Sequence, residues 1–169
     1  VNLHCAMDSY RWGNFREAVK PGADNAGWYE MLGIQSTGHG PQQPISITFT
    51  DKTHPITQGL EDWTTINEEL YNNIQILTGK PLATGVQIVP PKAKKGETLP
   101  PDAKPTKATA VVAWTNEFGP NKTKIFSTTI GHNTATVSDA RYLSLVTRGI
   151  LWATGHISEN GQPEQGYGK

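Results

Sequence analysis

Residues 110–156 contain the pattern that most restricts how this chain can fold. A nearly continuous apolar run over 110–114 is followed by a β-branched run over 125–130. Turn-forming residues at 118–121 separate the two runs, so the segment predicts two neighbouring strands of a sheet.

The same segment then predicts one long amphipathic helix. Apolar residues recur at spacings of three and four from Tyr142 to Ala153, which is the period of a helix face. Ser138 or Asp139 can cap the start of this helix, and Gly155 can end it. A sheet covered by a helix is typical of the α/β class.

Shorter patterns before this segment predict further elements. Residues 1–6 are apolar on both faces up to His4, which favours an interior strand of a parallel sheet. We also expect short helices over 14–20 and 26–32, a loop over 34–44, a turn over 54–60, and strands over 45–50, 74–77 and 86–89.

The chain reads as one domain with an exposed excursion. Its 169 residues are 36% apolar, which is enough for a sizeable core over residues 1–157. Residues 90–107 hold five prolines and five lysines with almost nothing to bury, so we expect them to lie in solvent. Residues 158–169 are a polar, glycine-rich tail.

Charge and cysteine content exclude several classes of function. Lys and Arg together number 15, as do Asp and Glu, so the neutral chain gives no electrostatic reason to bind nucleic acid or an anionic membrane. No apolar run approaches the ~20 residues of a membrane helix. The single cysteine excludes an internal disulfide. The compartment stays open between cytoplasmic and periplasmic or secreted.

Four residues are candidates for a polar site. His4 ends the first strand, His39 lies between two glycines, Glu69 follows Glu68, and His132 follows Gly131 at the end of a buried strand. Strand ends of open α/β sheets meet in one crevice, so we expect these side chains to converge. Imidazoles and a carboxylate suit proton transfer or a divalent metal ion, although no short metal-ligand spacing occurs in the sequence.

Cys5 is the one possible nucleophile beside this site. A strained strand-to-helix elbow needs small residues around the nucleophile, and no glycine occurs before Gly13. We therefore expect Cys5 to be a buried, inert cysteine.

Five blocks of sequence together resemble the ThuA-like (trehalose-utilisation) family of bacteria. They are residues 3–6, 54–60, 68–71, 113–114 with 129–133, and 148–155, and they occur in family order. The resemblance implies a flavodoxin-like, mostly parallel sheet with flanking helices, as in class I glutamine amidotransferases. It also implies that the N-terminal strands of the domain are missing, so we expect an upstream segment or another chain to complete the sheet.

The resemblance further implies a role in carbohydrate metabolism. The expected substrate is a small carbohydrate, either a disaccharide or an oxidised sugar, and the expected chemistry is of the hydrolase or lyase type. For such a reaction the candidate site residues are His4, Glu69 and His132 as catalytic groups, with His39, Tyr10 and Asn133 binding substrate. A divalent metal is compatible with this set.

Two other functions remain open. One is a non-catalytic module that binds glycans or a partner protein. The other is glutamine amidotransferase activity, which the missing elbow glycines and the missing late His-x-Glu pair disfavour.

Overall fold

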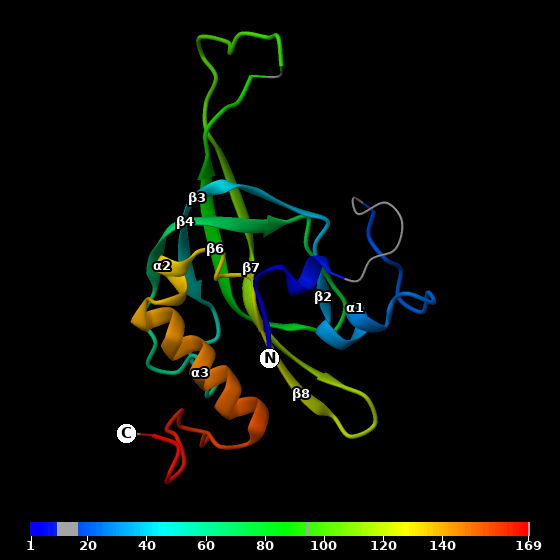
Figure 1. Ribbon diagram of the computed structural model, residues 1–169, viewed down its shortest axis with the longest axis vertical. Coiled ribbons are helices and arrows are strands. Elements are labelled where there is room, and N and C mark those ends of the chain that lie inside the picture. The colour runs from blue at the N-terminus through cyan, green and yellow to red at the C-terminus, as the bar shows by residue number, and fades with distance from the viewer. Residues whose placement is uncertain (10–16, 94, 169) are drawn as a thin grey trace.

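The computed structural model describes residues 1–9, 17–93 and 95–168, which fold around one six-stranded sheet (Figure 1). In spatial order its strands are β1 (Asn2–Leu3), β8 (Thr123–Thr128), β7 (Thr106–Phe118), β6 (Lys80–Val89), β3 (Gly38–Phe49) and β4 (Trp63–Asn72). Two short strands, β2 (Ile34–Gln35) and β5 (Gln75–Ile76), pair separately. The helices are the 3-10 helix η1 (His4–Asp8), α1 (Gly27–Leu32), α2 (Thr134–Val137) and α3 (Ala140–Thr154).

The α/β class is confirmed, but the predicted mostly parallel sheet is not what the described residues form. Only β1 and β8 pair in parallel, and the other neighbouring strands of the six-stranded sheet are antiparallel. The physical reason lies in the connections. β7 turns into β8 through four residues, and a hairpin that short can only join antiparallel strands. The result is a mixed sheet.

The first strand departs from its prediction in length and position. β1 is two residues long and lies at the edge of the described sheet, although its parallel pairing is as predicted. The backbone leaves the strand at His4 and enters η1. An interior strand over 1–6 is therefore wrong for the described residues.

The hairpin and the long helix are confirmed. β7 and β8 pair in register from Ala113 opposite Thr128 to Phe118 opposite Thr123. Asp139 caps the start of α3 by accepting a hydrogen bond from the Arg141 amide. The helix ends at Gly155, whose φ of 81° is left-handed.

Two clusters of buried side chains cover opposite faces of the sheet. Figure 1 shows α3 and α1 on either side of the central strands. The first cluster, beneath α3, includes Phe126, Ile130, Tyr142 and Leu145. The second lies beside α1 and includes Met7, Leu32, Ile34, Tyr71 and Trp114. β7 contributes to both clusters, which explains why its apolar run is continuous rather than alternating.

The remaining segments divide into confirmed and corrected predictions. The helix over 26–32 is confirmed as α1, the turn over 54–60 is confirmed, and residues 90–107 are exposed or half-exposed where described, forming the long protrusion between β6 and β7 (Figure 1). The loop over 34–44 is wrong, because β2 and the first half of β3 occupy it. The predicted helix over 14–20 is wrong for the described residues 17–20, which are not helical, and its first three residues lie outside the described part of the chain.

Within the described ranges, no helix is long and apolar enough to cross a bilayer.

Helix α3 lies so close to β8 that Gly149 has no room for a side chain. A Cβ there would lie 2.1 Å from Cδ1 of Phe126, which is itself fully buried. We expect Gly149→Ala to lower the free energy of unfolding by ~1–3 kcal/mol from overpacking, outweighing the ~1 kcal/mol by which alanine favours a helix. Urea denaturation measures this, with the exposed Thr147→Ala as the control. An unchanged midpoint for Gly149→Ala would contradict the close packing.

The cap of α3 should make stability depend on pH. Hydrogen bonds from the Arg141 side chain and amide hold the pKa of Asp139 at about 2. Because this folded pKa lies below the ~3.9 of an unfolded aspartate, the carboxylate stabilises the fold above about pH 4 and loses that effect as pH falls towards 2. Asp139→Asn keeps a capping oxygen but does not titrate. The stability gap between the wild-type protein and Asp139→Asn should therefore shrink on acidification, and a gap constant from pH 7 to pH 2 would refute the assignment.

Candidate functional site

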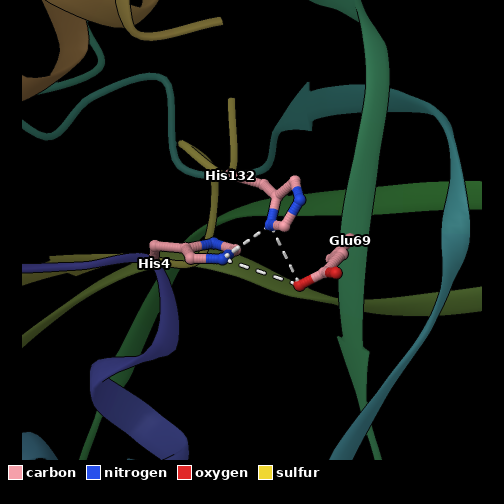
Figure 2. A group of neighbouring side chains, drawn as sticks. All are labelled: His4, Glu69 and His132. Carbon is pink, nitrogen blue, oxygen red and sulfur yellow. Dashed lines mark hydrogen bonds and ion pairs between the residues drawn. The ribbon is translucent and has the colours of Figure 1, made fainter. Parts of the chain in front are cut away.

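His4, Glu69 and His132 meet at one point, although they lie far apart in the sequence (Figure 2). Nδ1 of His132 is 3.2 Å from Oε2 of Glu69 and 3.2 Å from Nε2 of His4. Nε2 of His4 is 3.6 Å from the same Glu69 oxygen. We call these three residues the His/Glu cluster. Each comes from a different segment: η1, β4 and the loop after β8.

His4 stands at the sharp turn where β1 becomes η1. Its φ of 52° lies in the left-handed region, which is uncommon for a residue that carries a Cβ. Nδ1 of His4 lies 3.0 Å from the carbonyl oxygen of Thr129. A carbonyl only accepts hydrogen bonds, so Nδ1 carries the ring proton and Nε2 presents a lone pair to the His/Glu cluster.

Glu69 reaches the cluster because of its register on β4. Glu69 and Tyr71 are two residues apart and therefore share a face of the strand. On β3, Gln42 pairs with Glu69 and His39 pairs with Tyr71. Three steps along β3 thus face two along β4, and this bulge brings Gln42 and His39 to the same face.

The bulge places polar groups around the Glu69 carboxylate. Nε2 of Gln42 donates to Oε1 of Glu69 at 3.4 Å and lies 2.8 Å from Nε2 of His132. Nδ1 of His39 is 3.8 Å from Oε1 and donates to its neighbour's carbonyl, that of Gly40, at 2.8 Å. Both oxygens of Glu69 therefore have polar partners.

His132 is held from behind by Glu68. Both oxygens of the Glu68 carboxylate accept a hydrogen bond from the backbone N–H of His132, at 3.1 and 3.0 Å. Glu68 itself is fully buried. The loop approaches α3 closely at Gly131, where φ is 123° and a Cβ would lie 2.8 Å from the Tyr142 hydroxyl. Only glycine fits there without strain.

The cluster is buried on its carboxylate side and open on its imidazole side. The exposed fraction of the side chain is 11% for Glu69, 20% for His4, 31% for His132 and 42% for His39. A ligand therefore meets the imidazoles first. Tyr71 lies beneath them with its ring 5.4 Å from the rings of His4 and His39, and its burial raises the pKa of its hydroxyl, so it stays protonated.

The structure brings four of the six predicted site residues together: His4, His39, Glu69 and His132. His39 sits on strand β3 rather than on a loop. Asn133 instead caps α2 by accepting the Thr136 amide, and it donates to the carbonyl of Asn67 at 2.7 Å. Its amide is thus engaged within the protein, and contact with substrate stays a prediction. Tyr10 lies outside the described residues.

Cys5 corrects one expectation. It is exposed rather than buried, and it forms part of η1. The strained position after the strand belongs to His4, not to Cys5, so the elbow presents an imidazole to the site. This correction has a simple cause: β1 is too short to bury the residues that follow it.

Sequence reasoning missed Gln42 and gave no role to Glu68 or Tyr71. Gln42 belongs to a segment that looks like a loop, and only its pairing with β4 places it opposite Glu69. The two glutamates are both buried, on opposite faces of β4. Strand periodicity would have placed Tyr71 beside Glu69 once β4 was recognised as a strand.

A separate cavity lies away from the His/Glu cluster. It measures about 350 Å³ and is lined by residues 59–63 with Phe49, Ala140, Arg141 and Ser144. It shares no residue with the His/Glu cluster. The Arg141 guanidinium packs over the Trp63 ring at its wall, 4.6 Å from the ring centre.

Fold and cluster together define an α/β domain with a histidine and carboxylate site beside the parallel pair β1 and β8. A model of the trehalose utilisation (ThuA) family matches residues 1–153, and the chain belongs to that family. This membership connects the chain with carbohydrate metabolism in general.

One solved structure is similar to the chain. It is described as a ThuA-like protein from Parabacteroides merdae, with 27% sequence identity and a TM-score of 0.47. The match covers 72% of this chain and 42% of the other, so this chain spans less than half the length of its neighbour. No curated protein matches the chain.

The loop that carries His132 should depend on Glu68. Glu68→Ala removes the acceptor of the His132 N–H, whereas Glu68→Gln keeps an oxygen in its place. We expect the His132 amide to exchange its hydrogen with solvent at least tenfold faster in Glu68→Ala, with most of the protection kept in Glu68→Gln. Hydrogen exchange followed by NMR measures this directly, whereas overall stability mixes the lost bond with relief of a buried charge. Equal exchange in the two variants would contradict the anchoring role.

Proposed function

We propose that this domain converts a disaccharide or an oxidised sugar by proton transfer at the His/Glu cluster. The observation that carries the proposal is the convergence of two imidazole nitrogens and one carboxylate oxygen within 3.2–3.6 Å, on a side of the protein open to solvent. Family membership supports the carbohydrate class of the substrate.

His4 has the features of a general base. Its Nδ1 proton is held by the Thr129 carbonyl, so Nε2 is free to take a proton from a sugar hydroxyl or from a carbon beside a carbonyl. The imidazolium that forms would face the Glu69 carboxylate, which stabilises the new positive charge. A positioned base of this kind contributes about 10²–10⁴-fold to a rate.

His132 and His39 complement the base. With the Gln42 amide nitrogen facing His132, Gln42 donates a hydrogen bond to Nε2 of His132. The ring proton of His132 is then on Nδ1, which faces Glu69. His39 is the most exposed of the imidazoles and sits at the rim, where it can bind a sugar hydroxyl. The site thus offers a base, a carboxylate that stabilises charge, and a donor or acceptor for orientation.

The experiment compares conversion with binding. The wild-type protein is incubated with a panel of disaccharides and their oxidised derivatives, and products are followed by chromatography. We expect Glu69→Gln and His132→Ala to lower the rate at least 10²-fold while binding, measured by calorimetry, changes less than tenfold.

His156→Ala is the matched control. Nδ1 of His156 lies 3.2 Å from Oε2 of Glu164 in a similar pair, and neither residue belongs to the His/Glu cluster. It should convert sugar at the wild-type rate. Binding without conversion by the wild-type protein across the panel would support the alternative, a glycan-binding module. Glutaminase activity lost on Cys5→Ser would support an amidotransferase.

A further inference from the structure

We infer that the His/Glu cluster binds one divalent transition-metal ion of the Zn²⁺ class, through Nε2 of His4, Oε2 of Glu69 and Nδ1 of His132. The binding is inferred from geometry alone, whereas any part the ion has in catalysis rests on the proposed function. With the ion bound, the Nε2 lone pair of His4 would hold the metal, and water on the ion's open position would take the place of His4 as the base. Two histidines and one glutamate are a known ligand set of catalytic zinc sites.

The separations of the three donor atoms fit one ion. They are 3.6, 3.2 and 3.2 Å, and a triangle of these sides has its corners about 1.9 Å from its centre. An ion slightly above that plane is therefore about 2.0–2.2 Å from all three atoms, which is the usual length of Zn–N and Zn–O bonds. The donors of a tetrahedral site with such bonds lie about 3.3 Å apart, as they do here.

The protonation of His4 suits a metal ligand. Its Nδ1 donates to the Thr129 carbonyl at 3.0 Å, so the lone pair on Nε2 points at the other two donors. A backbone carbonyl that receives the second N–H of a ligating imidazole is the usual partner behind a metal-binding histidine, because it fixes the tautomer and the ring orientation.

Gln42 can give His132 the same support. Its amide nitrogen lies 2.8 Å from Nε2 of His132, and turning the amide over places the oxygen at that position, in exchange for the 3.4 Å hydrogen bond that the amide donates to Oε1 of Glu69. Nε2 of His132 would then donate to Gln42, and Nδ1 would present its lone pair to the ion. In that tautomer Nδ1 of His132 and Nε2 of His4, 3.2 Å apart, both present lone pairs, and a cation that both face holds them together.

The ligand types select the class of metal. Imidazole nitrogen suits Zn²⁺ and its first-row neighbours, whereas Mg²⁺ and Ca²⁺ prefer all-oxygen sites. Among the described residues the group holds three protein ligands, and the His4 and His132 side chains are 20% and 31% exposed. The remaining position thus faces solvent, as in catalytic rather than structural zinc sites, and would take water or a sugar oxygen.

The test is direct metal binding by the full chain after treatment with a chelator and dialysis. Co²⁺ is titrated and its visible absorption recorded, and Zn²⁺ affinity is measured by competition with a chelating dye. We expect one equivalent of Co²⁺ with the absorption of a four- or five-coordinate site. His132→Ala and Glu69→Gln should weaken binding at least 100-fold, and Gln42→Ala about 10–100-fold, as for other partners of ligating histidines.

The control separates the cluster from chance binding. His156→Ala should bind Co²⁺ as tightly as the wild-type protein, and circular dichroism checks that each variant is folded. Absence of stoichiometric binding by the wild-type protein would overturn the inference, and so would wild-type affinity in folded Glu69→Gln and His132→Ala.

The result is independent of the proposed function. Sugar conversion that survives complete removal of the metal would refute a catalytic role for the ion and leave the proposed function standing. Stoichiometric Co²⁺ binding at the cluster, without conversion of any sugar, would leave the metal site standing and refute the proposed function.

Discussion

The site depends on the burial of two successive carboxylates on one strand. Glu68 and Glu69 point to opposite faces of β4, and their residues are 0% and 9% exposed. A buried carboxylate is costly unless polar or charged groups compensate it. Glu68 is compensated by the amide of His132, and Glu69 by imidazoles and Gln42. Glu68 therefore fixes the backbone of His132, and Glu69 fixes its side chain. Both contacts come from strand β4.

Backbone geometry supplies the convergence that periodicity alone cannot. On a regular strand, His39 and Gln42 would point to opposite faces, because they are three residues apart. The extra residue in β3 turns both towards Glu69. Gln87 holds this irregular stretch, since its side-chain amide donates to the carbonyls of Pro41 and Gln43, and it is fully buried. A polar side chain from β6 thus replaces ladder bonds where β3 no longer pairs with it.

The sequence predicted the elements whose signals are local. The apolar runs of β7 and β8, the caps of α3 and the helix α1 depend on neighbouring residues, and each was found as predicted. The early half of β3 was missed because it contains Gly38, Gly40 and Pro41, which usually break strands. That half is a strand because β4 offers partners, so its conformation is decided by tertiary contacts rather than propensity. The mostly parallel sheet was predicted from the family resemblance. The short hairpin between the two apolar runs already implied antiparallel pairing. The candidate residues were found because histidines at strand ends and beside glycines are local signals, whereas Gln42 required the register.

Departures from ordinary folding rules gather at one place in this molecule. Among the described residues, the non-glycine residues with positive φ are His4, Asn73 and Lys122. Asn73 and Lys122 lie in the turns after β4 and β7, where a left-handed residue is ordinary. His4, in contrast, combines a strained backbone with membership of the His/Glu cluster, and Gly131, with φ 123°, precedes its partner His132. Strain, buried charge and a bulge each lower stability, and a fold retains such features together where the surrounding structure over-determines them. Their coincidence around Glu69 is a physical argument, separate from any family relation, for the proposal that this cluster is the functional centre of the domain.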